Sequence, residues 1–466
     1  MRIRTTHHVD HPVQAVQDWF DRPGALTRLT PPSLGGAEDP DTGGTETGRL
    51  VGVRLGPAVL PSVLRPQMVS HHIASDGPGH FIDRQAKGPF RTWQHEHTIT
   101  ADGPDRTAIT DEIVLELPRR LERFEELSAD QVRSLLAFRH RQLRDDLAFH
   151  ARFADTPRRT IAIAGSSGLI GTQLVALLRT GGHTVKRMVR EAEAREGEIA
   201  WDPKAGLLDP ADLRDVDVVI NLAGSSIATR WTPRARRRIH ASRVRSAHLI
   251  ARILAHMEDG PRVLVQASAI GGYGGQRPGE LLTEADPGGE GFLAEVVRDW
   301  EASARPAVQA GLRVAAVRTG IVLSDAGGSL LPQLPLFWAG AGGRLTRPDA
   351  VQSWISLDDI ARVFAHAALS PQVDGPVNGV APQPVTAREF ARTLGKVMKR
   401  PSLVPVPQAG PRLLLGADAA KELIGADQNV SDAWLQATGF TAAHPDLETA
   451  LRHVLRRWPQ AASSSR

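Results

Sequence analysis

Residues 160–178 read TIAIAGSSGLIGTQLVALL and decide the fold of most of the chain. The run IAIA is short enough for one buried strand, and the apolar residues after GSSG recur at helical spacing, so a strand turns directly into a helix. Gly165, Gly168 and Gly171 lie at this turn in the order G-x-x-G-x-x-G. Glycines there let the chain turn tightly and approach a pyrophosphate, and the helix start offers free N–H groups. Because a second strand follows at residues 183–189, we expect a dinucleotide-binding turn. Its contacts are expected from Gly165, Ser167, Gly168, Leu169, Ile170 and Gly171.

The alternation of strand and helix continues beyond this stretch. From Thr160 to about Val380 it predicts an α/β fold built on a doubly wound parallel sheet. After the first two strands we expect four more, at residues 198–201, 217–222, 263–267 and 312–317. The predicted parts are residues 1–155, residues 159–405, a small helical module over residues 406–457, and a disordered tail over residues 458–466.

Residues 1–155 follow a different pattern. A short helix starts after Pro12, several alternating strand segments follow, and residues 129–153 carry apolar side chains along one stripe of a long helix. This order predicts an antiparallel sheet packed on a long last helix. A Gly- and Pro-rich stretch over residues 31–48 is expected to be a loop.

The composition is typical of a globular protein with more than one domain. A chain of 466 residues is too long for one ordinary core, and 41% hydrophobic with 23% charged residues fits a soluble protein. The absence of cysteine excludes disulfides, thiol catalysis and Cys-ligated zinc. The first ten residues lack the apolar segment of a signal peptide, and no apolar run approaches the roughly 20 residues that span a bilayer. We therefore expect a cytoplasmic protein that does not bind membranes.

Basic residues are spread along the chain. The formal net charge is +4, and the densest basic run is RARRR at residues 234–238. No aromatic residues or recognition motif accompany this run, so it is interpreted as a solvated helix face. We expect no nucleic-acid partner.

Arginines near the end of the second strand indicate the cofactor. An Asp or Glu there accepts hydrogen bonds from the ribose hydroxyls of NAD, whereas arginine pairs with the 2′-phosphate of NADP. Arg187 and Arg190 favour NADP, while the adjacent Glu191 keeps NAD open as the alternative. Further cofactor contacts are expected from the NLAG run after the fourth strand, at Leu222, Ala223 and Gly224.

Taken together, GSSGLIG and NLAG resemble the extended short-chain dehydrogenase/reductase superfamily. Further motifs in the same order, WDPKAG, SAIGGYG, RTGIVLS and WISLDDIA, are similar to its NAD-dependent epimerase family, whose members end in a small C-terminal module of unknown function. The resemblance covers about two thirds of the chain and implies a Rossmann fold.

The first part of the chain resembles a different group. Its order of elements, with the phrases FRTWQHEHTIT and TAITDEIVLELP, is loosely similar to the START-like polyketide cyclase superfamily. That resemblance implies a helix-grip α+β fold with an apolar cavity for a small hydrophobic ligand. It implies no catalytic residues.

Catalytic residues follow from the first resemblance. It implies a Ser or Thr after the fifth strand that orients the substrate oxygen, and a Tyr whose pKa is lowered by a Lys four residues later. Ser268 lies in the expected place, but Phe292 and Val296 stand where the Tyr and Lys would fall. The only tyrosine of the chain, Tyr273, is followed four residues later by Arg277. Ser268 and Tyr273 are therefore the expected catalytic residues, and the alternative is that Tyr273 only packs against the cofactor.

Two features after the sixth strand bear on the substrate. Arg318 ends that strand at the edge where open α/β sheets bind ligands, and it would suit an anionic or carbonyl substrate. The alternative is a structural ion pair, with Asp358 or Asp359 as partner. Residues 325–347 are rich in Gly and Pro and are either a lid or a poorly ordered connection.

Histidines in the first part raise the question of a metal. His95 and His97 point to the same side of one strand, and His71 or His72 would complete a set of ligands. With no cysteine and no carboxylate at matched spacing, we expect ordinary, partly exposed strand residues and no metal.

Two functions stay open from the sequence. The first is an NADP-dependent, epimerase-like oxidoreductase acting on a small carbonyl or alcohol. The second is a protein that binds a dinucleotide without redox chemistry, as a sensor or scaffold, which the missing Tyr-x-x-x-Lys pair favours. In both, residues 1–155 are expected to bind a hydrophobic ligand, and an oligomer is left open.

Overall fold

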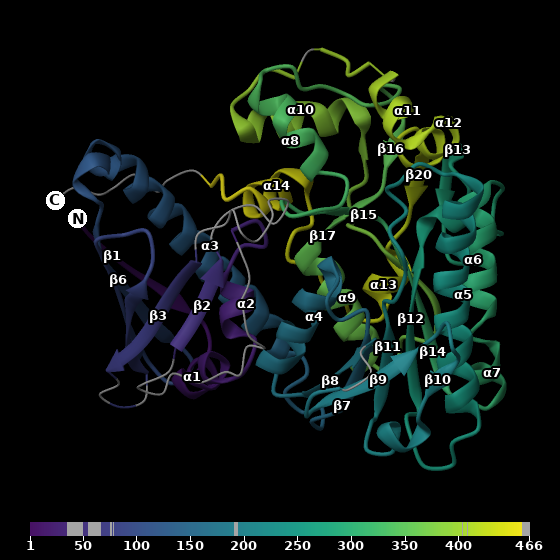
Figure 1. Cartoon of the computed structure of the whole chain (residues 1–466), viewed down its shortest axis with the longest axis horizontal. Helices are drawn as coiled ribbons and strands as arrows, with labels where there is room; N and C mark the ends of the chain where they lie inside the picture. Colours follow the sequence, from purple (N-terminus) through teal and green to yellow (C-terminus); the bar gives the residue numbers. More distant parts are fainter. Residues whose placement is uncertain are drawn as a thin grey trace. The chain divides into compact units, whose positions relative to one another are not determined.

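The computed structural model describes residues 1–34, 50–54, 67–74, 77, 79–190, 194–402, 404–407 and 409–458 (Figure 1). The chain divides into two compact units, which are described separately. The first unit comprises Met1–Thr156, Ala176–Gly182 and Arg452–Arg466, and the second comprises Pro157–Val175 and His183–Leu451. The expected disordered tail lies, apart from Trp458, outside the described residues.

The second unit is built on an eight-stranded sheet of order β10-β9-β8-β7-β11-β12-β14-β18. Every neighbouring pair in it is parallel except β10 with β9. The expected α/β fold on a doubly wound parallel sheet is thereby confirmed. The strands are β7 (Thr160–Ala164), β8 (Thr184–Val189), β9 (Glu198–Asp202), β10 (Leu207–Leu208), β11 (Val218–Asn221), β12 (Val263–Ala269), β14 (Arg313–Thr319) and β18 (Gly375–Gly379).

Helices pack on both faces of this sheet. Figure 1 shows α5, α6 and α7 on one side of the strands and α9 on the other. The bounds are α4 (Leu169–Thr180), α5 (Pro233–Ala255), α6 (Phe292–Ala302), α7 (Arg305–Gln309), α9 (Leu357–Leu369) and α10 (Ala387–Met398). Strands covered on both faces read as continuous apolar runs, and residues 161–164 of β7 are indeed fully buried. Because the strands are parallel, their carboxyl ends share one edge, where the glycine turn also lies.

The C-terminal module contains one strand as well as helices. It comprises α11 (Ala409–Leu415), α12 (Ala417–Leu423), β20 (Asp427–Val430), α13 (Ala433–Ala437) and α14 (Leu447–Val454). β20 pairs in parallel with β13 (Gln276–Leu282), so the module that we expected to be helical also contains a strand. The segment reads DQNV, whose polar residues have low strand propensity, and pairing with a distant segment overrides that propensity. Smaller elements of the second unit are β15 (Ile321–Leu323), η5 (Leu331–Gln333), α8 (Leu334–Trp338), β16 (Val351–Gln352), β17 (Trp354–Ser356) and β19 (Val385–Thr386).

The first unit is a six-stranded antiparallel sheet with a long helix. The strand order is β1-β6-β5-β4-β3-β2, and α3 (Glu125–Ala151) covers the range where we expected the long helix. The other elements are β1 (Arg2–Val9), α1 (Val13–Asp21), α2 (Ala25–Leu29), β2 (Leu50–Arg54), β3 (Gln67–Ala74), β4 (His80–Lys87), β5 (Thr92–Ala101) and β6 (Thr107–Glu116). β1 was not predicted, although it pairs with β6 along its whole length. Most of the expected loop over residues 31–48 lies outside the described residues.

The core of the first unit has two apolar parts with polar side chains between them. One apolar cluster includes Trp19 and Leu147, and the other includes Ile113 and Leu136. Buried side chains of β5 and β6 lie between these clusters, and they include histidines and an aspartate. The inward face of the sheet is thus not uniformly apolar.

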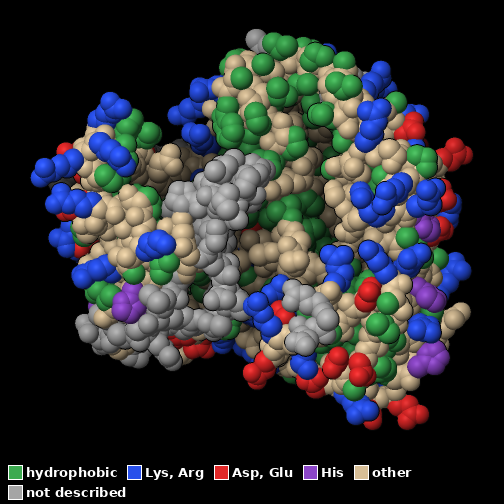
Figure 2. Space-filling view, viewed as in Figure 1, with side chains coloured by type: hydrophobic (Ala, Val, Ile, Leu, Met, Phe, Trp, Pro, Cys, Tyr) green, Lys and Arg blue, Asp and Glu red, His purple; other side chains and the backbone are tan. Residues whose placement is uncertain are grey.

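Two surface observations complete the description. Within the described ranges, no helix combines the length and apolar character needed to cross a bilayer. The run at residues 234–238 lies in the first turns of α5, where Arg234, Arg237 and Arg238 are exposed. On the face drawn in Figure 2, Lys and Arg side chains are dispersed among other kinds of side chain.

Candidate functional site

The glycine turn and the NLAG run lie against each other. Gly165 has φ +78°, a conformation that favours glycine, and a Cβ there would lie 2.8 Å from the carbonyl carbon of Leu222. A Cβ at Gly171 would collide with the Gly165 carbonyl oxygen and lie 2.9 Å from Ser166 Cα. Two of the three glycines are therefore required by close backbone packing.

The remaining residues of the turn surround the start of α4. Ser167 and Gly168 are exposed, and Leu169 and Ile170 are half-buried in the first helical turn. The first N–H groups of a helix have no partner within the helix, so they are available to an anion. The residues of this turn that we expect to contact a cofactor therefore lie together at the start of one helix.

Arg187 reaches this turn from β8. Its Nε lies 3.3 Å from Ser166 Oγ, to which it donates, and its Nη1 lies 3.4 Å from Glu198 Oε1. Arg190 follows the end of β8 and is exposed. Glu191, the residue that kept NAD open, lies outside the described residues.

The NLAG run is held by its own side chains. Asn221 Nδ2 donates to Gln266 Oε1 at 3.0 Å, and Asn221 Oδ1 accepts from the Ala223 N–H at 3.1 Å. A Cβ at Gly224 would lie 3.2 Å from Arg243 Cζ. The sequence interpretation missed Arg243, although burial lowers its pKa to about 10 and it lies directly beside the run.

Ser268 and Arg318 meet at a carboxylate that was not predicted. They are register partners on β12 and β14. Ser268 Oγ donates to Glu301 Oε1 at 2.6 Å, and Arg318 donates through Nε to Oε1 at 2.9 Å and through Nη2 to Oε2 at 3.0 Å. Arg318 therefore forms an ion pair with Glu301 of α6. Burial lowers the pKa of Arg318, but the carboxylate of Glu301 outweighs burial and raises it.

Tyr273 is buried and joined to the same network. Its hydroxyl donates to Asn378 Oδ1 at 2.8 Å and accepts from Arg318 Nη1 at 2.9 Å. Burial raises the pKa of Tyr273, and the positive charge of Arg318 opposes that rise. Arg277 instead donates to the backbone carbonyl of Tyr273 at 3.3 Å and pairs with Glu280. Arg318, not Arg277, is the guanidinium at the phenol.

Two of these partners could not be found from sequence spacing. Glu301 lies near the end of α6, 33 residues from Ser268, and no motif marks it. Asn378 is the register partner of Arg318 on β18, a strand that was not predicted. In the sequence, Asn378 is marked only by its place in the short run VNG, which does not by itself predict a strand.

The start of α6 is organised by the C-terminal module. The backbone N–H groups of Phe292 and Leu293 donate to the Glu422 carboxylate at 3.1 and 2.9 Å. The Phe292 ring lies edge-on to Trp231, with centroids 4.9 Å apart. The position where the family tyrosine was expected is thus in an aromatic contact at a capped helix start.

The segment over residues 325–347 is partly helical. It contains η5 and α8, and Phe337 is buried while Trp338 is exposed. A Cβ at Gly327 would lie 3.2 Å from the Leu169 side chain, so the segment begins beside the glycine turn. Asp359, one of the partners considered for Arg318, pairs with Arg362 at 3.1 Å.

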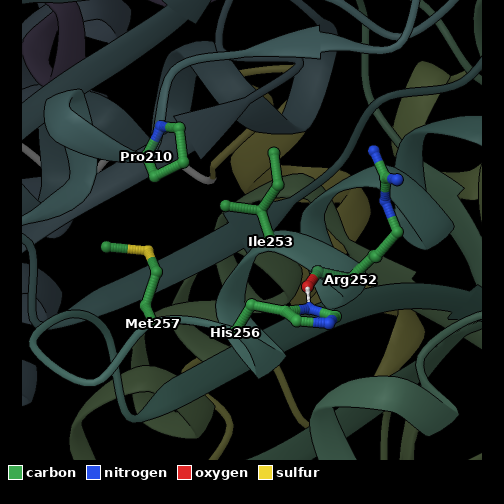
Figure 3. A pocket seen from close by; sticks show the side chains of 5 residues that line it. All are labelled: Pro210, Arg252, Ile253, His256 and Met257. Atoms are coloured by element: carbon green, nitrogen blue, oxygen red, sulfur yellow. Dashed lines mark hydrogen bonds between the residues drawn. The ribbon is translucent and has the colours of Figure 1, made fainter.

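A separate hollow lies at the other end of α5. It is lined by Pro210, Arg252, Ile253, His256 and Met257 (Figure 3). α5 ends shortly before β12 starts, so this hollow is at the amino edge of the sheet, opposite the glycine turn. His256 Nδ1 lies 2.7 Å from the Arg252 carbonyl oxygen.

Comparisons with known proteins agree with the fold and the motifs. The NAD dependent epimerase/dehydratase family matches residues 161–292, and a domain of unknown function (DUF1731) matches residues 406–454. Epimerase family protein Mb2239 of Mycobacterium bovis is 40% identical over 298 residues, which are 64% of this chain and 98% of that protein. The chain belongs to this epimerase family. The family expected from the motifs is confirmed, together with its C-terminal module.

Two solved structures are similar to this epimerase-family chain. The crystal structure of a nucleoside-diphosphate sugar epimerase from Corynebacterium glutamicum is 31% identical, with a TM-score of 0.80 over 99% of this chain and 91% of that one. Human epimerase family protein SDR39U1, solved with NADPH, is 30% identical, with a TM-score of 0.57 over 64% of this chain and all of that one. The bacterial structure therefore matches both units of the chain.

The histidines of the first unit are more buried than we expected. His95 and His97 lie on the same side of β5 as predicted, but they are buried, 3% and 2% exposed, not partly exposed. His72 lies 3.1 Å from Asp83 through its Nδ1. The carboxylate that was missing from the sequence pattern is Asp111 on β6, 2.8 Å from His95 Nε2.

Proposed function

We propose that the second unit binds NADP(H) at the turn over residues 165–171 and acts as an epimerase-like oxidoreductase on a small carbonyl or alcohol. The observation that carries the proposal is the meeting of Ser268, Tyr273 and Arg318 at the carboxyl edge of the sheet that also holds the glycine turn. A relative 30% identical to this chain was solved with NADPH, which supports the choice of cofactor.

The residues at the turn fit a dinucleotide. Gly165 and Gly171 leave no room for side chains between the turn and α4, and the helix start would hold the diphosphate. Arg187, beside Ser166, and the exposed Arg190 would pair with the 2′-phosphate. NAD is the alternative cofactor.

The cofactor would supply or accept a hydride at the substrate carbon. Ser268 would orient the substrate oxygen, and the Tyr273 hydroxyl would exchange a proton with it. Arg318 would stabilise the phenolate, in place of the absent lysine, because its guanidinium is 2.9 Å from the hydroxyl. Its ion pair with Glu301 would hold it in that orientation.

The test measures binding and turnover separately. We expect NADPH to bind and its absorbance at 340 nm to fall with one or more members of a panel of small aldehydes and ketones. Ser268→Ala and Tyr273→Phe should reduce the rate by about 100-fold or more while cofactor binding is kept. Ser370→Ala is the matched control, because its hydroxyl donates to Gln372 and bonds to no residue of the candidate site in the described part of the chain.

A non-catalytic sensor or scaffold is the second candidate. The observation that favours it is the replacement of the family Tyr by Phe292 and of the family Lys by Val296. NADPH binding without turnover of any panel member, with Tyr273→Phe equal to the unmodified protein in a functional readout, would establish this candidate and remove the first.

We further propose that the first unit is a START-like domain that binds a small, largely hydrophobic ligand. The antiparallel sheet and the long α3 support this proposal. Titration with a fluorescent hydrophobic probe tests it: saturable binding, lost on substituting Phe81→Asp in the core, is the expected result.

A further inference from the structure

An aspartate interrupts the apolar inward face of the first unit's sheet. Ile109, Asp111 and Ile113 occupy successive buried positions of β6, and Asp111 is the register partner of His97 on β5. A side chain at such a position normally packs between sheet and helix and is apolar. An isolated carboxylate is strongly unfavourable in a protein interior, so Asp111 requires compensating partners.

Three imidazoles converge on this carboxylate. His95 Nε2 and His97 Nδ1 lie 2.8 and 2.9 Å from Asp111 Oδ1, and His140 Nε2 lies 2.9 Å from Oδ2. We call His95, His97, Asp111 and His140 the histidine cluster. Its members come from β5, β6 and α3, so the folded unit alone assembles it.

The cluster is shielded from water. The exposed fractions of the side chains are 4% for His95, 2% for His97, 6% for Asp111 and 17% for His140. The ligand atoms of His95, His97 and Asp111 all lie within 4.8 Å of one another. The ring centroids of His95 and His97 are 3.8 Å apart, so the two imidazoles lie in contact with each other.

Several buried histidine ring nitrogens near the cluster have no hydrogen-bond partner among the described residues. Among the described residues, His97 Nδ1 is buried without a hydrogen bond of acceptable geometry despite its closeness to Asp111, and both ring nitrogens of His7 are buried without one. His7 stacks on His140, with ring centroids 3.1 Å apart. Each neutral imidazole keeps one nitrogen lone pair, which is a ligand for a metal ion.

The charged side chains beside the cluster have a net negative charge, which favours a cation. Arg139 Nη1 donates to His95 Nδ1 at 3.4 Å, so His95 Nε2 carries the proton and donates to Asp111 in this structure. Metal binding through Nε2 requires the other tautomer of His95 and release of the Arg139 contact. Asp83 Oδ2 lies 3.9 Å from His97 Nε2. With neutral imidazoles, the two carboxylates exceed the one guanidinium by one negative charge, so a divalent cation would meet a net attractive field.

We propose that His95 Nε2, His97 Nδ1 and the Asp111 carboxylate bind a divalent first-row transition metal ion inside the first unit. Two imidazoles and one carboxylate are a donor set for zinc and for iron(II), and they leave a coordination position for a ligand of the interior. His140 binds the other oxygen of Asp111 and orients the carboxylate toward the ion. Metal bonds of about 2.0–2.2 Å require the three ligand atoms to separate by a few tenths of an ångström.

The experiment uses the full chain after removal of metal with a chelator. Calorimetric titration with Zn²⁺, and titration with Co²⁺ followed by visible absorbance, should each show one equivalent bound per chain. His97→Gln and Asp111→Asn should weaken binding about 100-fold or more. His8→Gln is the matched control, because His8 lies on the same sheet, is exposed and pairs with Asp102.

Folding of the variants is checked by circular dichroism before titration. A crystal of the unmodified protein soaked in Zn²⁺ gives a second measurement that needs no variant, and an anomalous peak between His95, His97 and Asp111 supports the proposal. It is overturned by a folded, unmodified protein that binds no Zn²⁺ or Co²⁺, by an anomalous peak only at other residues, or by Asp111→Asn and His97→Gln variants that bind like the control.

Discussion

At the scale of single residues, Tyr273 is the most informative side chain. It is the only tyrosine in the chain, and its hydroxyl is enclosed by Asn378 and Arg318. Any change in phenolate absorbance therefore reports this one group. The protonation state of the Tyr273 hydroxyl decides whether it can donate a proton at neutral pH.

Ionisation of Tyr273 should require a higher pH in the folded protein than in the unfolded chain. Burial raises its pKa above the ordinary value of 10.0, and Arg318 only partly opposes the rise. Absorbance at 295 nm should therefore increase above pH 10 for the native protein and near pH 10 in denaturant. Since the folded state holds the proton more tightly, the free energy of unfolding should fall as pH rises above 10. Tyr273→Phe should abolish the absorbance change, whereas native ionisation below pH 10 would contradict the assignment.

Arg190 should discriminate between the two cofactors. Its guanidinium can pair with a 2′-phosphate but has no such partner in NAD, so Arg190→Ala should weaken NADP about tenfold or more and NAD much less. Binding titrations with both cofactors measure the difference. Lys204→Ala, an exposed substitution in the turn after β9, serves as the control. Equal losses for both cofactors would show that Arg190 does not contact the phosphate.

Gly171 should not tolerate a side chain. A methyl group there would collide with the Gly165 carbonyl oxygen, so Gly171→Ala should move α4 away from the turn and cost about 1–3 kcal/mol of unfolding free energy. Cofactor affinity should fall with it. Gly410→Ala is the matched control, because a Cβ at Gly410 meets nothing within 4 Å. Thermal unfolding and NADPH titration give both quantities, and a Gly171→Ala protein equal to the control would refute the packing argument.

At the scale of elements, the C-terminal module holds the start of α6. The Glu422 carboxylate accepts from the first two N–H groups of that helix and lies at the positive end of its dipole. α6 also carries Glu301, which binds Ser268 and Arg318. The module and the candidate site are therefore connected through one helix.

Substituting Glu422 should loosen that connection. Glu422→Ala should cost about 0.5–2 kcal/mol of unfolding free energy, because two helix N–H groups lose their acceptor. Lys421→Ala changes the neighbouring side chain of α12 and is the control. Chemical denaturation measures both, and equal stabilities would mean that water replaces the carboxylate without loss.

Periodicity explains what could be predicted from the sequence and what could not. β7 and α4 were predictable because an apolar run and a helical repeat directly adjoin the glycines. β18 and β20 were not, because GPVNG and DQNV are short and lack an apolar pattern, and distant pairing alone makes them strands. Asp111 is a different case: its two-residue spacing from Ile109 and Ile113 indicates burial on the inward side of β6, but not that it meets the histidines of β5.

At the scale of the whole molecule, each compact unit is made of stretches that are separate in the sequence. The first unit ends at Thr156 but includes the segment from Arg452 onward. Within that unit, His453 Nε2 lies 3.1 Å from Gln142 Oε1, and Ser134 Oγ donates to the Arg456 carbonyl oxygen at 2.6 Å. Local patterns cannot predict such a return, because it joins residues more than 300 positions apart.

Residues 1–156 expressed alone should accordingly be less stable than the first unit of the full chain. His453→Ala tests the same contact in the intact protein and should cost about 1–3 kcal/mol, because buried Gln142 loses a partner. His256→Ala, which removes an exposed imidazole, is the control. A thermal midpoint unchanged by His453→Ala would show that the returning segment does not stabilise the first unit.

The ion pair between Arg318 and Glu301 bears on which substrates the site can accept. Arg318 donates to both oxygens of Glu301 and to the Tyr273 hydroxyl, so its guanidinium offers an incoming molecule little surplus positive charge. Under the proposed function, we expect a substrate that binds at this end of the sheet to be an uncharged aldehyde, ketone or alcohol at its reacting end. Phosphorylated or carboxylated competitors would have to displace Glu301 first, and they should be discriminated against for that reason.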